Sequence, residues 1–236
     1  MTKKASLMKH GTLGLLGGTF DPIHNGHLWV ARESATRLSL DSVRLIPCGV
    51  PTHRRSPMAS AQDRVAMLEA ALQEQNRKKV SFPKIIIDTR EIISSSPNYT
   101  HTTLSSLRRE NPNAALIWLM GEDAFLGLSH WYRWQNLFDL AHFVVFAREN
   151  AATLDGAPDA LPKELREVLA TREIDNPALL SASRFGAVYR MKLPPFEVSS
   201  SDIRTALARQ DLSALEHLLP KSVLAYIVGH RLYSSL

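Results

Sequence analysis

The stretch that decides the fold is Gly17-Gly18-Thr19-Phe20-Asp21-Pro22-Ile23-His24-Asn25-Gly26-His27. A short apolar run, Leu13–Leu16, precedes it, and residues 28–33 after it have the composition of a helix. The stretch is therefore predicted to be a turn that leads from a strand into a helix. Glycines in such a turn let the backbone approach a ligand closely. The free N–H groups at the helix start attract phosphate.

Two histidines in this stretch have a spacing that matters. His24 and His27 are three residues apart, which places both side chains on one face at the start of a helix. Two imidazoles directed at a phosphate site would donate hydrogen bonds to its oxygens. A single Gly-Gly pair or a single histidine more often has only a structural role. The combination of glycines, a proline and two spaced histidines favours the functional interpretation.

Apolar runs and helix-like segments alternate along the rest of the chain. Further strands are predicted at 42–47, 84–88, 114–120, 142–147 and 186–191, and helices at 26–39, 60–76, before 110, 135–140, from 199 for about ten residues, and 221–230. This alternation predicts an α/β fold with a Rossmann-like, doubly wound parallel sheet and a C-terminal helical subdomain. We expect a frayed N-terminus at 1–9 and one domain over 10–236. Within it, an insertion is expected at about 150–185 and the helical part at about 199–236.

Size and composition limit the class of protein. The chain has 236 residues, of which 44% are hydrophobic, and no apolar run approaches the roughly 20 residues that cross a bilayer. The single Cys48 excludes an intrachain disulfide. We expect a cytoplasmic protein without a membrane partner. The net charge of +5 attracts anions, but the basic residues are scattered, which favours an anionic small molecule over nucleic acid.

A second phosphate site is predicted near the C-terminus. Ser199, Ser200 and Ser201 precede a helix, and a serine there is typical of an N-cap, which explains the hydroxyls without any ligand. A cap does not explain Arg204, whose guanidinium would project from the same helix start. Two such helix starts suggest a polyphosphate held between them.

Other polar residues follow the carboxyl ends of predicted strands, where ligands bind in open α/β sheets. Asp123, after Gly121, is predicted either to accept hydrogen bonds from ribose hydroxyls or to cap the next helix. Trp131 either lies in the core or stacks on a flat heterocycle. His53 and Arg54 are either solvated or reach an anionic substrate, and Arg148 follows another strand.

The sequence lacks the motifs of several common nucleotide-binding and catalytic sites. It contains no Gly-x-x-x-x-Gly-Lys-Ser/Thr phosphate loop, no dinucleotide fingerprint and no Gly-x-Ser-x-Gly nucleophile elbow. No residue cluster has the spacing of a protein metal site, so no metal ligand is predicted. A Mg²⁺ ion would be bound mainly through phosphates and water.

The stretch Gly17–His27 resembles the (T/H)xGH signature of the nucleotidyltransferase superfamily, and its extended form resembles bacterial nicotinate mononucleotide adenylyltransferases. Further segments agree in order: 46–54, 63–67, 88–92, 97–100, 121–131, 198–204 and 220–233. The resemblance covers nearly the whole chain except 1–9 and 150–185. Thr52, Arg54, Thr102 and Glu122 depart from the family pattern.

The resemblance implies transfer of AMP from ATP to nicotinate mononucleotide, with Mg²⁺, giving deamido-NAD and pyrophosphate in NAD biosynthesis. It implies His24, His27 and Arg204 as catalytic residues. The residues implied to bind ATP are Gly17, Gly18, Thr19, Phe20, His24, His27, Gly121, Asp123, Ser199, Ser200 and Arg204. Those implied to bind the mononucleotide are His53, Arg54, Tyr99, Thr100, Trp131 and Arg148.

Three alternatives remain open at this point. The acceptor could be nicotinamide mononucleotide, although the nicotinate form is expected to be preferred. It could also be another phosphorylated molecule such as phosphopantetheine. The non-enzyme alternative is a basic α/β module that binds RNA. A homo-oligomer is also compatible with the sequence.

Overall fold

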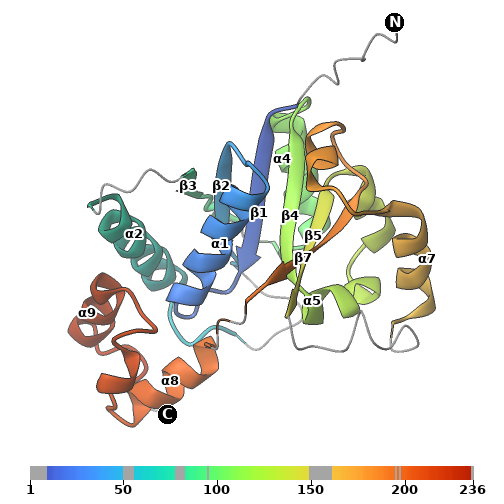
Figure 1. Ribbon diagram of the computed structural model, residues 1–236. Coiled ribbons are helices and arrows are strands. Elements are labelled where there is room, and N and C mark those ends of the chain that lie inside the picture. Colours follow the sequence, from blue (N-terminus) through green and yellow to red (C-terminus); the bar gives the residue numbers. More distant parts are fainter. Residues whose placement is uncertain are drawn as a thin grey trace, which may run out of the picture. The chain divides into compact units, whose positions relative to one another are not determined.

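The computed structural model describes residues 10–49, 56–77, 83–94, 96–148, 161–194, 196 and 198–234. In these residues, seven strands form one sheet in the order β3-β2-β1-β4-β5-β7-β6 (Figure 1). The strands are β1 Thr12–Gly18, β2 Ser42–Pro47, β3 Lys84–Ile87, β4 Ala115–Gly121, β5 His142–Arg148, β6 Glu173–Ile174 and β7 Val188–Leu193. The order runs outward from β1 to β3 and then returns to β4, which is the doubly wound arrangement.

Helices connect these strands. The α-helices are α1 Asn25–Arg37, α2 Ala61–Arg77, α3 Arg90–Ile93, α4 Thr100–Glu110, α5 Glu122–Leu126, α7 Lys163–Arg172, α8 Ser200–Ala208 and α9 Lys221–Gly229. The 3₁₀ helices are η1 Leu128–His130, η2 Trp134–Asp139, η4 Pro177–Ser181 and η5 Ser213–Leu215. Each parallel strand pair in the sheet requires such a crossover. The predicted α/β class with a parallel sheet is confirmed.

The chain forms two compact units. The first comprises residues up to 15, 38–41 and 99–195, and the second comprises 16–37, 42–98 and 196–236. Strand β1 contributes residues to both.

The first unit contains the sheet's most apolar strand. All six residues from Ala115 to Met120 in β4 are buried, as expected for a parallel strand covered on both faces. β4 pairs in parallel with β5, and β5 in turn with β7, placing Phe143 opposite Val188. The guanidinium of Arg108 in α4 donates to the carbonyl oxygens of Leu140 and Ala114, both at 2.7 Å. These bonds give two main-chain carbonyl oxygens beside the strands a hydrogen-bond partner.

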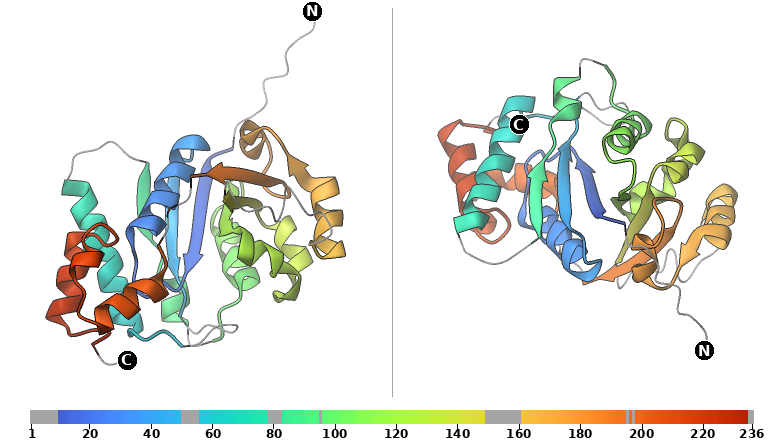
Figure 2. Two further views of the ribbon diagram at one scale, coloured as in Figure 1. Left: turned by 60° about the horizontal axis from the view of Figure 1, so that its bottom comes forward. Right: turned by 90° about the horizontal axis from the view of Figure 1, so that it is seen from above.

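The second unit joins β2 and β3 to the C-terminal helices. β2 and β3 pair in parallel, with Val43 opposite Ile85. Helix α2 packs against β3 and against α9. Figures 1 and 2 show α9 lying beside α2. Three hydrogen bonds join α9 to α2. The Ser222 N–H donates to Glu74 at 2.9 Å, its hydroxyl donates to the carbonyl oxygen of Ala70 at 3.0 Å, and the Tyr226 hydroxyl donates to Asp63 at 3.0 Å. The C-terminal residues are therefore an integral part of this unit.

Two details differ from the sequence-based expectation. The segment expected to be a helical excursion contains α7, but it also contains the two-residue strand β6, which pairs with β7. A strand this short shows no alternation, so the pattern predicts six strands rather than seven. The helix expected at 135–140 is a 3₁₀ helix. The single-domain boundaries and the 150–185 insertion stay predictions, and residues 1–9 and 149–160 lie outside the described residues.

Candidate functional site

The turn after β1 has a left-handed residue at its centre. Phe20 has a φ of 50°, and its side chain is almost fully buried. Its ring folds back so far that a Cβ on Gly18 would lie 3.0 Å from it, a closer approach than most such contacts, so the absence of a side chain at Gly18 gives the ring room. A non-glycine residue in this conformation persists only where its surroundings hold it. The following Asp21–Pro22 peptide bond is cis.

The two histidines lie together at the start of α1, as their spacing predicts. Their rings stack with centroids 3.7 Å apart and planes inclined at 27°. Phe20 meets the ring of His27 edge-on at 5.0 Å. The main-chain N–H of His27 donates to Nδ1 of His24 at 3.4 Å. Because a main-chain N–H only donates, Nδ1 of His24 accepts, and the neutral ring carries its proton on Nε2.

Both imidazoles are neutral at pH 7. Burial lowers the pKa of His24 to about 4. Burial, and secondarily the charge of His24, lowers the pKa of His27 well below its ordinary value. His27 Nδ1 is buried and has no hydrogen-bond partner among the described residues. The pair can therefore act as N–H donors to an anion.

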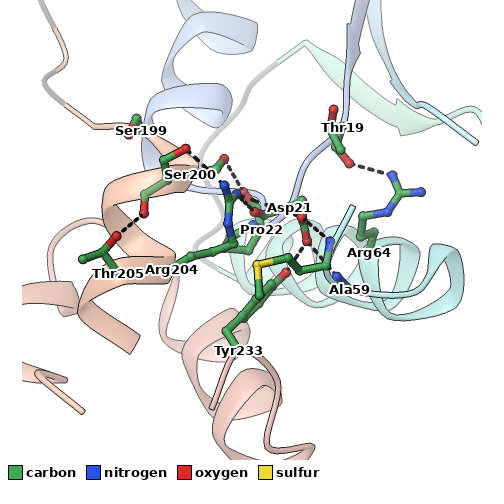
Figure 3. Close-up of polar contacts among 12 residues, drawn as sticks. Thr19, Asp21, Pro22, Ala59, Arg64, Ser199, Ser200, Arg204, Thr205 and Tyr233 are labelled. Carbon is green, nitrogen blue, oxygen red and sulfur yellow. Dashed lines mark hydrogen bonds and ion pairs between the residues drawn. The ribbon is translucent and has the colours of Figure 1, made fainter. Parts of the chain in front are cut away.

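The start of α8 is tied directly to the turn (Figure 3). The Arg204 guanidinium donates through Nη1 to the carbonyl oxygen of Asp21 at 2.6 Å, and the Ser200 hydroxyl donates to that of Pro22 at 3.1 Å. A Cβ on Gly26 would lie 2.6 Å from Cγ1 of Val198. The two helix starts predicted from sequence are therefore adjacent in the second unit.

The three serines before α8 have different roles. Ser199 is the N-cap, and its hydroxyl accepts the N–H of Asp202 at 3.1 Å, so the structural interpretation holds for this residue. Ser200 contacts the turn, and Ser201 accepts from Nη2 of Arg204 at 3.1 Å. The capped helix leaves first-turn N–H groups and the positive end of its dipole beside Arg204.

A buried carboxylate supports the turn. Asp21 accepts the main-chain N–H groups of Met58 at 2.8 Å and Ala59 at 3.1 Å, and also the hydroxyl of Tyr233 at 2.7 Å (Figure 3). Burial and the hydrogen bond to Asp21 raise the pKa of Tyr233, so the phenol stays protonated and donates. Sequence reasoning assigned no role to Asp21 or Tyr233, because they are 212 positions apart.

A buried cation supports the turn from another direction. Arg64 in α2 is 1% exposed, and its Nη1 donates to the carbonyl oxygen of Thr19 at 2.6 Å. Burial lowers its pKa, while the charges of Cys48 and Asp21 act in the opposite direction. An arginine remains charged under such conditions. Sequence reasoning placed Arg64 on a helix but did not connect it to the turn.

Other predicted residues lie in the first unit. Asp123 is exposed in the first turn of α5, whose N-cap is Gly121, so the capping alternative for Asp123 is wrong. Tyr99 is the N-cap of α4, and Thr100 is its first residue. Trp131 lies at the end of η1 and is half-buried. It is therefore not a fully buried core residue, and part of its surface is accessible.

The sequence analysis missed an aromatic residue in this unit. The ring of Tyr132 is 44% exposed and lies 4.7 Å from that of Tyr99, centroid to centroid. His101 and Arg133 contact the same ring, at 5.9 Å and 5.1 Å. The sequence interpretation offered a stacking role for Trp131 and none for Tyr132, although the neighbouring Tyr132 is aromatic too.

The remaining predictions lie outside what the structure describes. His53 and Arg54 fall in the undescribed segment 50–55, and for Arg148 only the backbone, at the end of β5, is described. Among the described residues, no three His, Cys, Asp or Glu side chains gather as metal ligands would. Within the same residues, no helix is both long and apolar enough to cross a membrane.

Comparison with known proteins gives consistent matches. A family model described as cytidylyltransferase-like matches residues 15–206. A "probable nicotinate-nucleotide adenylyltransferase" of Aeromonas hydrophila is 40% identical over 221 residues, 94% of this chain and 96% of that protein. One of the same name from Dechloromonas aromatica is 41% identical over 225 residues, 94% of this chain and 97% of that protein.

Solved structures agree on the fold. Plasmodium falciparum nicotinic acid mononucleotide adenylyltransferase complexed with NaAD has a TM-score of 0.70 with this chain at 18% identity. The match covers 96% of this chain and 99% of that one. At this identity the likeness shows the fold alone.

Proposed function

The chain belongs to the cytidylyltransferase-like family and, within it, to the nicotinate-nucleotide adenylyltransferases, and on that premise we propose that it transfers the adenylyl group of ATP to nicotinate mononucleotide. The products are deamido-NAD and pyrophosphate, and the reaction is a step of NAD biosynthesis. The cytoplasmic location expected from the sequence is part of this proposal.

One observation carries the proposal: the starts of α1 and α8 adjoin at the turn. Arg204 and Ser200 bond to the carbonyl oxygens of Asp21 and Pro22. Arg204, the neutral histidines and the positive ends of two helix dipoles therefore gather at one place, where they complement a chain of phosphates.

We assign roles to the residues of the turn and of α8. The main chain of Gly17 to Phe20, together with His24 and His27, holds the ATP phosphates. Ser199, Ser200 and Arg204 hold the β and γ end, with Ser199 acting through the helix start that it caps. His24, His27 and Arg204 are the catalytic residues, because they stabilise the charge that builds on the α-phosphate and on the leaving pyrophosphate.

The chemistry needs no general base. A phosphate oxygen of the mononucleotide, ionised at neutral pH, attacks the α-phosphorus of ATP. The bond between that phosphorus and the bridging oxygen to the β-phosphate breaks, and pyrophosphate leaves. Catalysis is then alignment of two anions and electrostatic stabilisation. Neutral N–H donors in a desolvated turn suit this work, since they need not exchange protons.

The nucleotide substrate is MgATP. The Mg²⁺ ion is proposed to arrive on the phosphates and to keep water as most of its other ligands. Such an ion neutralises phosphate charge. Neither His24 nor His27 needs to be a ligand for it.

The other substrate contacts are proposed from the family resemblance. Gly121 and Asp123 meet the ribose of ATP, and the exposed position of Asp123 on α5 is compatible with this role. The mononucleotide contacts are His53, Arg54, Tyr99, Thr100, Trp131 and Arg148. Trp131 is proposed to stack on the nicotinate ring, and its half-buried position leaves part of its surface accessible.

The test is to mix purified protein with ATP and Mg²⁺ and to measure pyrophosphate release with different acceptors. Parallel reactions contain nicotinate mononucleotide, nicotinamide mononucleotide or phosphopantetheine. We expect the fastest release with nicotinate mononucleotide. If pyrophosphate release is faster with nicotinamide mononucleotide or with phosphopantetheine, that molecule is the acceptor and the proposed one is wrong. Absence of product from all three, with salt-dependent retention of RNA, would favour the RNA-binding alternative.

A further inference from the structure

The last described residues of the chain end at the phosphate-binding turn. The Tyr233 ring is 6% exposed, and its hydroxyl donates to Oδ1 of Asp21 at 2.7 Å (Figure 3). Tyr233 is not among the residues assigned above to the phosphates. Its hydroxyl is nevertheless directed at the residue whose carbonyl oxygen receives Arg204.

Asp21 connects three segments that are distant in sequence. Its carboxylate accepts the N–H groups of Met58 and Ala59, which precede α2, and the hydroxyl from the C-terminus. Its carbonyl oxygen accepts Nη1 of Arg204 from α8. The side chain and main chain of one residue therefore orient both the turn and the guanidinium.

The turn needs such support because of its backbone conformation. Phe20, directly before Asp21, has a φ of 50°, a left-handed conformation that residues with a Cβ disfavour. The conformation persists only if contacts on both sides hold it. On one side Arg64 binds the carbonyl oxygen of Thr19. On the other side the support is the set of bonds to Asp21.

We propose that Tyr233 is a positioning residue, which acts through the Asp21 carboxylate to hold the turn and Arg204 in the arrangement that receives the ATP phosphates. The inference rests on the proposed function in one respect, namely that phosphates bind at this turn. It does not depend on the identity of the acceptor.

The physical effect of removing the hydroxyl follows from burial. Tyr233→Phe keeps the ring and its packing but removes one of the three donors to the Asp21 carboxylate. A hydrogen bond to a buried charged group is among the stronger ones in proteins. The carboxylate then shifts toward its remaining partners and carries the turn with it. We expect the affinity for ATP to fall about tenfold, with a smaller change for AMP, which lacks the β and γ phosphates.

The chain offers a matched control. Tyr226 in α9 also donates its hydroxyl to an aspartate, Asp63 of α2, at 3.0 Å. Tyr226→Phe therefore removes a Tyr–Asp bond from the same C-terminal segment without touching the turn. If the C-terminus only stabilises the fold, the two variants should behave alike.

The experiment measures binding of ATP and AMP by titration calorimetry for the wild type, Tyr233→Phe and Tyr226→Phe, with thermal melting as a record of folding. The expected result is a loss of ATP affinity in Tyr233→Phe alone. Equal ATP affinities in all three proteins would overturn the inference. Equal losses for ATP and AMP would also overturn it, because the effect would then not concern the phosphates.

A double-mutant cycle tests the route through Asp21. Asp21→Asn and the Asp21→Asn/Tyr233→Phe double variant are measured in the same way. If Tyr233 acts through the carboxylate, the double variant loses little more affinity than Asp21→Asn alone. Additive losses would contradict this route. ATP binding with the expected pattern, but no turnover of nicotinate mononucleotide by the wild type, would overturn the acceptor assignment and leave the inference standing.

Discussion

The turn of the second unit and the aromatic group of the first unit are held by different kinds of contact. Charged and polar groups hold the turn: Asp21, Arg64 and Tyr233 are buried, and Arg204 is half-buried. Tyr99, His101 and Arg133 surround the exposed ring of Tyr132 through ring contacts. Under the proposed function, the first arrangement is preorganised for one kind of anion. The second presents an exposed aromatic ring, which under the proposed function would recognise a flat group. Four predictions test this difference, from the largest expected effect to the smallest.

The first concerns the donor role of the histidines. His27→Ala should lower kcat about 100-fold, since loss of one preorganised donor to a developing oxyanion costs about that much or more. The KM for ATP should change much less. Steady-state kinetics measure both values. The control is His217→Ala, whose side chain is exposed. A kcat near that of the wild type would exclude the electrostatic role of His27.

The second concerns the closeness of the two helix starts. Gly26→Ala places a Cβ 2.6 Å from Cγ1 of Val198, which is too close, so Val198 or its surroundings must shift. We expect a loss of about 2 kcal/mol in the free energy of unfolding, typical of overpacking. Gly229→Ala at the end of α9 meets no atom within 4 Å and should cost little. Urea unfolding measures all variants.

A second substitution sharpens this test. Val198→Ala removes the methyl group that the new Cβ would meet, so Gly26→Ala/Val198→Ala should recover part of the lost stability. If the double variant is no more stable than Gly26→Ala, the packing of Val198 against Gly26 is not the cause.

The third concerns pH. The pKa of His24 is about 4 in the folded protein and 6.5 in its ordinary environment. At pH values between these two pKa values, the unfolded chain binds more protons than the folded protein does. The free energy of unfolding therefore falls as the pH falls from about 7 to 4. Between pH 7 and pH 5, His24 should account for a loss of about 1–2 kcal/mol. Urea midpoints at both pH values should show this loss reduced in His24→Asn. His217→Asn should retain it in full.

The smallest effect on stability is expected in the first unit. Tyr132→Ala should change the free energy of unfolding by less than about 1 kcal/mol, because the ring is exposed. Under the proposed function, the KM for nicotinate mononucleotide should rise about threefold to tenfold while that for ATP stays constant. Tyr132→Phe, which keeps the ring, should resemble the wild type. A larger change in the KM for ATP would contradict a role of Tyr132 in binding the acceptor.

The sequence predicts the turn well because its signals are local. Glycines, a helix start and two histidines at a spacing of three act within eleven residues, and the stacked imidazoles confirm the predicted shared face. The same holds for the serine cap of α8. Strand β6 escapes prediction because two residues carry no periodic pattern. The exposed position of Tyr132 was not predicted, because single aromatic residues more often belong to a core.

The sequence by itself determined the α/β class, the strand-to-helix turn and the two helix starts suited to phosphate, because short-range spacing and backbone chemistry decide these features. Only the tertiary structure decided that the two helix starts adjoin through Arg204 and Ser200. It also decided that Asp21 receives a hydroxyl from Tyr233, 212 positions away, and that burial keeps His24 neutral. Contacts between distant residues and the loss of water around an imidazole arise from packing, which no local pattern records.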